Sequence, residues 1–384
     1  MIKEWRFQLK GIDVKMELEK NYTILKACRF CPMCKHLCSS GNLTMHESDY
    51  PRGRGLIMYS IYRGEPANAD YVNALYNCFM CGCCLAGCEG NFDLPELIKS
   101  ARVDIVNLNL EPAAIKELKK GLLLKGNIYG ISPDKSFTLQ NKRYENNDAD
   151  VLYIAGQSIN YNHFEIAEAA IRFFDKTKIK FSIIADEPDC GKALSLLGYK
   201  SEAKAAAKRF YEKVSAMKVK KLVSCDPMVI DCLLNDFKEF GFDINSSVKI
   251  MHFSEFAEII SKESNLTFKK FNKKITIADS EFLCKKNNIC DSARSIIRNI
   301  AGKNFTELYR NRAEAYATGE AAFYQNGAVF KDGKALGLKI CNDALKLDIK
   351  TIITMSGVAK ENITAAGDGR FEVYDIAEFI SASL

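Results

Sequence analysis

Nine of the 15 cysteines in this chain lie between Cys28 and Cys88, in two groups with the same spacing. In each group the first three cysteines are two residues apart, and a fourth follows after three more residues. The first group is Cys28, Cys31, Cys34 and Cys38, and the second is Cys78, Cys81, Cys84 and Cys88. The pattern C-x2-C-x2-C-x3-C lets three thiolates surround one corner of a cubane cluster while the fourth points away. The fold around both groups must therefore bring these thiols together.

The fourth cysteine of each group predicts an exchange of ligands, because in two-cluster ferredoxins it binds the other cluster. We expect two [4Fe-4S] clusters. The first cluster would take Cys28, Cys31, Cys34 and Cys88. The second cluster would take Cys78, Cys81, Cys84 and Cys38. Cys83 falls outside the pattern and is expected to be a neutral, packed thiol.

Zinc and disulfides are the alternative uses of these cysteines. Structural zinc usually takes two C-x2-C pairs, which would leave other cysteines of each group without a role. A disulfide framework needs an oxidising compartment, and residues 1–10 carry charges where a signal peptide needs an apolar stretch. No apolar run reaches the roughly 18 residues that span a bilayer. We therefore expect a cytoplasmic protein.

The net charge of +6 would ordinarily indicate an anionic partner. That count treats every cysteine as neutral. Eight thiolates together with two oxidised cluster cores would lower the charge to about +2. The basic residues near the cysteines would then balance the clusters, so we do not expect a nucleic-acid partner.

Two further segments, residues 51–57 (PRGRGLI) and residues 94–102 (LPELIKSAR), accompany the cysteine groups. Together they resemble the iron–sulfur subunits of glycolate oxidase. These proteins are related to an iron–sulfur component of anaerobic glycerol-3-phosphate dehydrogenase and to heterodisulfide reductase. The resemblance extends over nearly all of the chain. One departure is that Ser39 and Glu89 follow the fourth cysteines, where the family usually has proline.

The resemblance implies a multi-domain fold. An all-α ferredoxin-like domain with the two clusters would occupy residues 1–120, and residues 121–150 would form a linker. Two tandem small α/β repeats would follow, each a degenerate copy of the cysteine-rich domain that this family calls CCG. We expect the first copy at residues 151–270 and the second at residues 271–384.

Four pairs of segments support an internal duplication. The offsets between Gln157 and Glu281, Asp189 and Ala317, Cys225 and Met355, and Glu255 and Glu378 are 124, 128, 130 and 123 residues. Short β-branched runs alternate with amphipathic helical stretches in both copies, which predicts parallel strands joined by crossover helices.

Most of the sulfur positions of the CCG motif are lost in this chain. The resemblance places Gln157, Asp189, Cys190, Cys225 and Met228 at those positions in the first copy, and Glu281, Ala317, Thr318, Met355 and Val358 in the second. Because a cluster needs its full set of thiolates, we expect no catalytic cluster here. A single metal ion held by Asp189, Cys190 and Cys225, with His252, stays open. Four other cysteines are isolated and expected to be buried: Cys232, Cys284, Cys290 and Cys341.

The resemblance implies an electron-transfer subunit of an oxidoreductase complex, without a substrate-binding catalytic site of its own. Its partners would be an FAD-containing dehydrogenase of a 2-hydroxy acid or of glycerol 3-phosphate, and a quinone or another redox protein. The expected assembly is a hetero-oligomer, cytoplasmic or peripheral at the inner face of the membrane through a partner. The alternative is a heterodisulfide-reductase-like catalytic subunit that reduces a disulfide at a CCG site.

Overall fold

The computed structural model describes residues 8–9, 12–13, 16–145, 148–244, 246, 248–325, 327–330 and 333–384. The chain divides into two compact units. The first comprises residues 1–119, 193–200 and 321–331, and the second comprises residues 120–192, 201–320 and 332–384. Two short segments from the region of the predicted repeats thus belong to the first unit. Among the described residues, no helix is long and apolar enough to cross a membrane.

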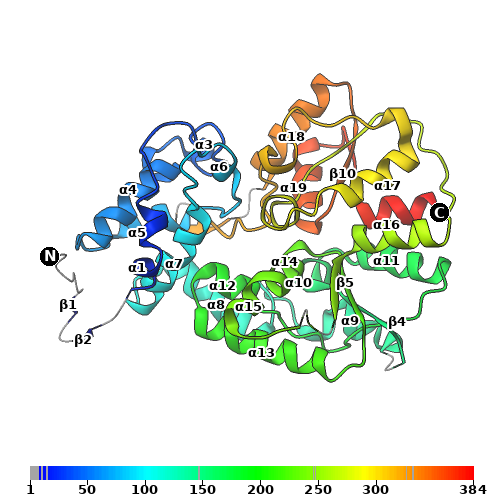
Figure 1. Ribbon diagram of the computed structural model, residues 1–384, viewed down its shortest axis with the longest axis horizontal. Coiled ribbons are helices and arrows are strands. Elements are labelled where there is room, and N and C mark those ends of the chain that lie inside the picture. Colours follow the sequence, from blue (N-terminus) through cyan, green and yellow to red (C-terminus); the bar gives the residue numbers. More distant parts are fainter. Residues whose placement is uncertain are drawn as a thin grey trace. The chain divides into compact units, whose positions relative to one another are not determined.

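Helices make up most of the described part of the first unit (Figure 1). They are α1 (Glu17–Lys20), α2 (Tyr22–Leu25), α3 (Gly41–Thr44), α4 (Pro51–Tyr62), α5 (Ala69–Tyr76), α6 (Cys83–Ala86), α7 (Leu94–Asn107) and the first half of α8 (Ala113–Lys125). Two short hairpins pair β1 (Gln8–Leu9) with β2 (Ile12–Asp13) and β8 (Tyr324–Gln325) with β9 (Ala328–Val329). Helix α12 (Lys192–Leu197) also packs almost entirely within this unit.

Local sequence signals fix where the longer helices of this unit begin. The Asp93 side chain accepts a hydrogen bond from the Glu96 backbone N–H at 3.2 Å, and Pro95 stands in the first turn of α7. Helix α4 likewise begins at a proline, Pro51. Within α4, a Cβ at Gly53 would overlap the Glu47 carbonyl oxygen. This glycine therefore lets the chain before the helix pack directly against it.

The second unit contains two parallel sheets. In the first, the strand order is β4 (Phe181–Ser182), β3 (Val151–Ile154), β5 (Lys221–Ser224) and β6 (Lys249–His252). The associated helices are α9 (Phe137–Gln140), α10 (Gly156–Tyr161), α11 (Phe164–Lys176), α13 (Lys200–Ser215), α14 (Pro227–Asp231), α15 (Phe237–Phe240) and α16 (Phe253–Glu263). A π-helical turn, Cys232–Asp236, joins α14 to α15. We call residues 151–270 the first repeat.

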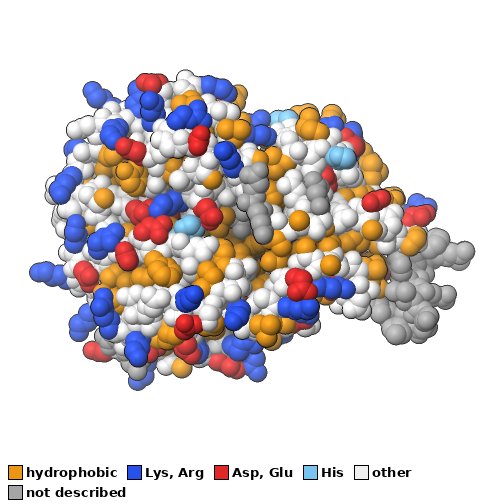
Figure 2. Space-filling view, turned by 180° about the vertical axis from the view of Figure 1, so that it is seen from behind, with side chains coloured by type: hydrophobic (Ala, Val, Ile, Leu, Met, Phe, Trp, Pro, Cys, Tyr) orange, Lys and Arg blue, Asp and Glu red, His pale blue; other side chains and the backbone are white. Residues whose placement is uncertain are grey.

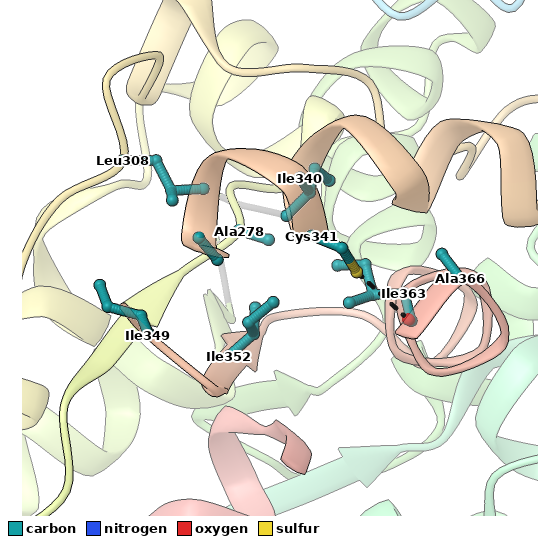
Figure 3. Packing of buried hydrophobic residues seen from close by; sticks show 9 residues of the cluster. Ala278, Leu308, Ile340, Cys341, Ile349, Ile352, Ile363 and Ala366 are labelled. Carbon is teal, nitrogen blue, oxygen red and sulfur yellow. Dashed lines mark hydrogen bonds between the residues drawn. The ribbon is translucent and has the colours of Figure 1, made fainter. Parts of the chain in front are cut away.

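The second sheet has the order β7 (Ile275–Ile277), β10 (Thr351–Thr354) and β11 (Glu372–Asp375). Its helices are α17 (Asp291–Ala301), α18 (Lys334–Lys346), α19 (Gly357–Gly367) and α20 (Ile376–Ser383). A buried cluster between this sheet and its helices forms part of the core, with Ile340 and Cys341 from α18, Ile352 from β10 and Ile363 from α19 (Figure 3). We call residues 271–384 the second repeat.

The two sheets share one register. Val151 pairs with Phe181 in the first sheet, and Ile275 forms a parallel bridge with Phe305 in the second, at an offset of 124 residues for both partners. The pairs Val151–Lys221 and Ile275–Thr351 correspond in the same way, as do Lys221–Lys249 and Thr351–Glu372. The offsets of these pairs match those found in the sequence. The strand order is therefore the same in both repeats.

The two repeats also contact each other within the second unit. Helices α11 and α20 pack together, and the Lys360 ammonium of α19 forms ion pairs with Glu165 of α11 at 2.8 Å and Glu378 of α20 at 2.9 Å. Residues 121–150, the predicted linker, contain the end of α8 and α9 and contact the first repeat. For example, the Ile128 N–H donates to the Gln157 side-chain oxygen at 2.9 Å.

Candidate metal centre

The eight patterned cysteines lie in two loops of the first unit. Cys28, Cys31 and Cys34 lie between α2 and α3, and Cys38 precedes α3. Cys78 and Cys81 follow α5, Cys84 lies in α6, and Cys88 follows that helix. All eight are thiols and not disulfides.

Both loops begin with the same turn. Phe30 and Met80, each two residues after the first cysteine of its group, have φ values of 55° and 50°. Their backbone N–H groups donate to the sulfurs of Cys28 and Cys78, both at 3.4 Å. Non-glycine residues rarely adopt positive φ, and such conformations concentrate at functional sites. The two C-x2-C segments are therefore held in one unusual conformation.

The thiols influence one another across the two groups. Burial raises the pKa of Cys28, and repulsion from Cys88 and Cys31 raises it further. Burial also raises the pKa of Cys34 to about 11, and Cys28 adds to this increase. These four cysteines are the set predicted for the first cluster. Cys88, the last cysteine of the second group, thus acts on the first cysteine of the first group.

Cysteines of both groups also act on the second predicted set. Burial raises the pKa of Cys84 well above its ordinary value, and Cys78 and Cys38 contribute through their charges. Cys83 and Cys34 act on Cys84 as well. Cys81 is half-buried and joins this set by its position in the sequence.

Small residues and backbone N–H groups surround the sulfurs. A Cβ at Gly55 would lie 3.7 Å from the Cys28 sulfur, and one at Gly90 would lie 3.9 Å from the Cys88 sulfur. The N–H groups of Gly41 and Phe92 donate to Cys38 at 3.3 Å and to Cys88 at 3.4 Å. Hydrogen bonds to ligand sulfurs are one means by which proteins tune iron–sulfur clusters.

In the described part of the chain, no group of three or more His, Cys, Asp or Glu side chains is placed to hold a metal ion. A single zinc ion draws its sulfur ligands to about 2.3 Å from one point. A four-iron cluster is a larger body that takes four thiolates around its outside. The donors present, eight thiols in two sets of four, fit two such clusters in number and chemistry. Asp189, Cys190 and Cys225 likewise form no ion-binding group in the structure.

The two groups differ in their exposure to water. Cys31 is exposed, and its neighbours Phe30 and Met33 are 41% and 55% exposed. In the second group, Cys78 and Cys84 are buried, and the residues that follow Cys78, Phe79 and Met80, are each 2% exposed. The same spacing therefore produces one solvent-facing loop and one enclosed loop.

Two buried arginines lie beside cysteines of the second predicted set. Arg54 in α4 directs Nη1 toward the Cys38 sulfur at 3.8 Å. Arg102 in α7 donates to the Cys78 carbonyl at 2.7 Å. No role for Arg102 was predicted from its position in the sequence. The sequence feature that could have identified it is a charged residue four positions after Ile98, on the apolar face of a predicted helix.

Known proteins give an independent comparison. No protein-family model matches the chain. A component of the "Dihydromethanophenazine:CoB--CoM heterodisulfide reductase" of Methanosarcina mazei is 22% identical over 334 residues, 82% of this chain and 79% of that protein. The Bacillus subtilis protein "Probable iron-sulfur-binding oxidoreductase FadF" is 22% identical over 269 residues, 66% of this chain and 37% of that protein. These relatives fit a heterodisulfide-reductase-related iron–sulfur family, to which this chain is similar at 22% identity.

Two further similarities extend this comparison. The Syntrophomonas wolfei protein "EtfAB:quinone oxidoreductase" is 22% identical to 60% of this chain, which spans 34% of that protein. The crystal structure of a hypothetical protein from Helicobacter pylori matches with a TM-score of 0.54 at 10% identity, covering 86% of this chain and 68% of that one. That match shows a shared fold alone.

In this chain, residues at the positions where the resemblance expects CCG sulfurs make hydrogen bonds instead. In the first repeat the Gln157 amide donates to the Asp189 carboxylate at 2.6 Å. In the second, the Glu281 carboxylate accepts from the Thr318 N–H at 2.7 Å and the Gly319 N–H at 2.8 Å. These hydrogen bonds join residue 157 to residue 189 in the first repeat and residue 281 to residues 318 and 319 in the second. They need no cofactor to do so.

A small cavity adjoins the first of these pairs. Its volume is about 20 Å³, which is close to what one water molecule needs. Its lining includes Gln157, Asp189, Cys190 and Glu187. Burial raises the pKa of Glu187 to about 7, although its carboxylate accepts from the N–H groups before Gln157.

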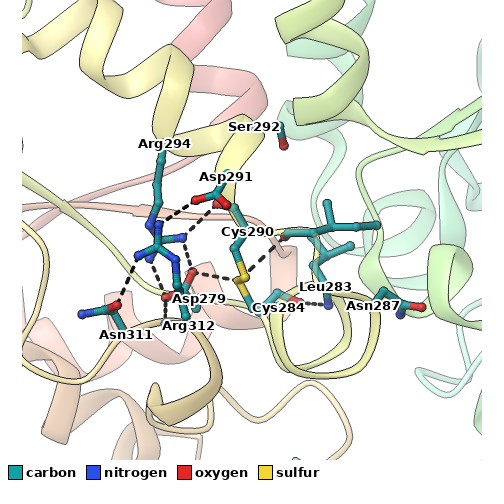
Figure 4. The surroundings of a disulfide bond; sticks show 12 residues. Asp279, Leu283, Cys284, Asn287, Cys290, Asp291, Ser292, Arg294, Asn311 and Arg312 are labelled. Atoms are coloured by element: carbon teal, nitrogen blue, oxygen red, sulfur yellow. Dashed lines mark hydrogen bonds and ion pairs between the residues drawn. A yellow bond between two sulfur atoms is a disulfide. The ribbon is translucent and has the colours of Figure 1, made fainter.

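Cys284 and Cys290, expected to be isolated, form a disulfide (Figure 4). Asp279 lies beside it, 3.1 Å from the Cys284 sulfur, and also pairs with Arg294. The expectation of isolated thiols is wrong for these two residues. The only hint in the sequence was their separation of six residues, which by itself does not predict a bond.

Charged side chains are interspersed on the face shown in Figure 2. Lysine and arginine alternate there with aspartate and glutamate and with apolar patches.

Proposed function

We propose that this chain is an iron–sulfur electron-transfer subunit of an oxidoreductase complex. The observation that supports the proposal is that each fourth cysteine lies beside the chain of the opposite group. A Cβ at Gly90 would lie 3.9 Å from the Cys88 sulfur and 2.7 Å from the carbonyl oxygen of Ala27, the residue before Cys28. Arg54 lies 3.8 Å from the Cys38 sulfur and donates at 2.7 Å to the carbonyl of Ala74, four residues before Cys78. An exchange of ligands between the groups is the arrangement that two-cluster ferredoxins use. The names of the relatives, which include an iron–sulfur-binding oxidoreductase, support the same role.

The two ligand sets of this proposal are those predicted from the spacing. One is Cys28, Cys31, Cys34 and Cys88, and the other is Cys78, Cys81, Cys84 and Cys38. Each set would hold one [4Fe-4S] cluster, which supplies the capacity to accept and release one electron. The chain itself positions the thiols, donates hydrogen bonds from backbone N–H groups to the sulfurs, and controls how far water can reach them.

The partners follow from the resemblance and from the relatives. We propose a flavoprotein dehydrogenase that carries FAD, acting on a 2-hydroxy acid or glycerol 3-phosphate, as one partner. A quinone or a further redox protein would be the other. The Syntrophomonas relative is named as a quinone oxidoreductase, and the Methanosarcina relative is one component of a larger enzyme. The complex would be a hetero-oligomer in the cytoplasm or at the inner face of the membrane.

A second candidate is a catalytic subunit that reduces a disulfide. The observation in its favour is the match to a heterodisulfide reductase component over 79% of that protein's length. Two of the ten expected CCG sulfur positions, Cys190 and Cys225, retain cysteine. Gln157 and Glu281 hold their loops through hydrogen bonds at two of the other positions. We therefore favour electron transfer without a catalytic cluster in the repeats.

Iron and acid-labile sulfide analysis of anaerobically purified chain tests the proposal. Two cubanes require about eight irons and about eight sulfides per chain. Zinc in place of iron would refute it. A distinctly higher iron content would favour the catalytic candidate, since that candidate needs a further cluster.

The exchange of ligands needs a separate test. Cys38→Ser should alter the electron paramagnetic resonance signal of the cluster held by Cys78, Cys81 and Cys84. Cys83→Ser is the matched control, because Cys83 is buried beside Cys84 but lies outside the pattern. If Cys38→Ser altered only the cluster of Cys28, Cys31 and Cys34, the exchanged assignment would be wrong.

A further inference from the structure

Arg54 and Arg102 are buried cations at the second cysteine set, with exposures of 0% and 2%. Arg54 donates through Nε to the Ala74 carbonyl at 2.7 Å and lies 3.5 Å from the Asp49 carboxylate. The Nη2 atom is the one that faces Asp49, and it makes no hydrogen bond there. The Nη1 atom lies 3.8 Å from the Cys38 sulfur. Arg54 is therefore only partly balanced by one carboxylate, and its other terminal nitrogen faces a cysteine of the second set.

Arg102 is surrounded by neutral groups. It donates to the carbonyls of Cys78, Tyr76 and Leu75 at 2.7, 3.0 and 3.2 Å, and it stacks over the Tyr76 ring at 4.9 Å. Its Nη1 donates to the Leu196 carbonyl at 2.7 Å. Within the described residues, no carboxylate pairs with it. A buried charge without a counter-charge is costly, and the thiolates of the adjacent cysteine set are the anions that would compensate it.

The first cysteine set has cations of a different kind. Arg52 pairs with Glu47 at 2.5 Å, and Lys35 pairs with the same carboxylate at 2.8 Å. The Arg52 side chain is 32% exposed and that of Lys35 45% exposed. Water and salt screen charges at such positions, and Glu47 already neutralises one of them. Their influence on the Cys28 group is therefore weak.

Segments from the repeat region close over the second set. The Tyr76 hydroxyl donates to the Leu197 carbonyl at 3.0 Å, and the Tyr324 hydroxyl donates to the Asn73 side chain at 2.5 Å. The Phe79 ring packs on Phe330 at 4.9 Å. These segments follow Gly191 and Gly319, the corresponding glycines of the two repeats. Each repeat thus supplies a segment of chain that covers the enclosed loop and excludes water from it.

We propose that Arg54 and Arg102 make the cluster held by Cys38, Cys78, Cys81 and Cys84 the higher-potential centre of the two. This inference rests on the proposed function. Reduction adds one negative charge to a cluster. Net charge, hydrogen bonds and solvent exposure set the potential of such centres. Burial alone disfavours the added charge, but two nearby guanidinium groups favour it, and the low dielectric strengthens their effect.

The test is a redox titration of the full chain, loaded anaerobically with iron and sulfide and followed by electron paramagnetic resonance. In the wild type, the cluster that responds to Cys38→Ser should titrate at the higher potential. Arg102→Gln should lower that potential by more than about 59 mV, a tenfold change in the equilibrium constant for one electron. The other cluster should stay within that limit and acts as an internal reference.

Arg52→Gln is the matched control, since it removes an exposed arginine beside the first set. It should shift neither potential by as much as about 59 mV, the value that corresponds to a tenfold change in the equilibrium constant. Arg102→Lys keeps the charge and should shift the potential less than Arg102→Gln does. If Arg102→Gln does not retain iron, Arg54→Gln is judged by the same criterion.

Two results would overturn the inference. One is a wild-type titration in which the enclosed cluster has the lower potential. The other is a glutamine variant that keeps about eight irons per chain but leaves the potential of the enclosed cluster unchanged. Both leave the proposed function intact, whereas a wild-type chain without iron would remove the function itself.

Discussion

The first and second repeats have the same strand order but hold their buried polar groups differently. Helices α16 and α20 occupy equivalent places, and each begins with a capping box, formed by His252 with Glu255 and by Asp375 with Glu378. The cap residue is an imidazole in one repeat and a carboxylic acid in the other. What the duplication preserves is a hydrogen-bond acceptor for the helix N-terminus, whatever its acid–base chemistry.

The buried cations show the same contrast. In the first repeat Lys192 pairs with Asp231 and Asp236. In the second, Arg294 pairs with Asp279 at 2.7 Å (Figure 4). It also pairs with Glu307 at 2.8 Å. These sites do not correspond in sequence. Each repeat thus anchors its loops with an ionic cluster of its own, which is consistent with a structural role for both.

The largest expected loss of unfolding free energy comes from removing the cation of the ionic cluster in the second repeat. Arg294→Met leaves Asp279 buried without its partner, and removing one side of a buried pair costs about 3–5 kcal/mol. The free energy of unfolding, from urea titration of the cluster-loaded chain, measures this. Arg298→Met is the control, because Arg298 pairs with the same Glu307 but its side chain is 55% exposed, so its loss should cost about 0–1 kcal/mol.

Lys192→Met tests the ionic cluster of the first repeat in the same way. We expect a similar loss of stability, since Asp231 and Asp236 are both buried. A loss no larger than that of Arg298→Met would show that the two ionic clusters are not comparable.

The next effect is on the stability of the folded chain as the pH is lowered. Burial lowers the pKa of His252 from 6.5 to about 4, so its ring stays neutral in the folded chain while the unfolded chain becomes protonated. Between pH 6.5 and pH 4 the unfolded state therefore binds more protons, and stability falls by about 3 kcal/mol as the pH is lowered. His252→Asn keeps a cap acceptor and should remove this part of the pH dependence. Melting temperatures measured across this window provide the readout.

Asp375 should respond in the opposite direction. Burial raises its pKa well above 3.8, so the folded chain keeps a proton that the unfolded chain releases. Stability from this group is present at low pH and is lost as the pH rises above 3.8. Asp375→Asn should therefore stabilise the chain at neutral pH. A variant whose melting temperature at neutral pH falls would contradict this expectation.

A smaller effect is expected at the corresponding loop glycines. Gly191 and Gly319 have φ values of 90° and 93°. A Cβ at Gly191 would also lie 2.5 Å from the Ala203 carbonyl oxygen. Gly191→Ala should cost about 2 kcal/mol in unfolding free energy. Gly241→Ala is the control, with a φ of 85° but open space around it, and should cost about 1 kcal/mol.

Local patterns in the sequence anticipated much of the local structure. The β-branched runs at Val151–Ile154 and Thr351–Thr354 form strands, because such residues pack well on a pleated surface. The duplication could be recognised because strand positions tolerate few insertions. The spacing of the cysteines predicts the two cluster sets, and the number and type of clusters stay predictions.

Long-range packing could not be predicted in the same way. The difference in exposure between Cys31 and Cys78 depends on segments more than a hundred residues away, such as the one that contains Leu196. The contact of Cys284 with Cys290 depends on how one loop folds back. Hydrophobic periodicity describes one element at a time and does not encode which loop covers another.

The exposed position of Cys31 has a practical consequence for handling the protein. Dissolved oxygen attacks iron–sulfur centres that it can reach, and a ligand at the surface offers it a path that the enclosed loop does not. If the chain holds the two proposed clusters, material purified in air should lose its colour in two stages, first at the outer loop. Iron analysis before and after exposure to air would then distinguish partial decay from a chain that holds a single cluster.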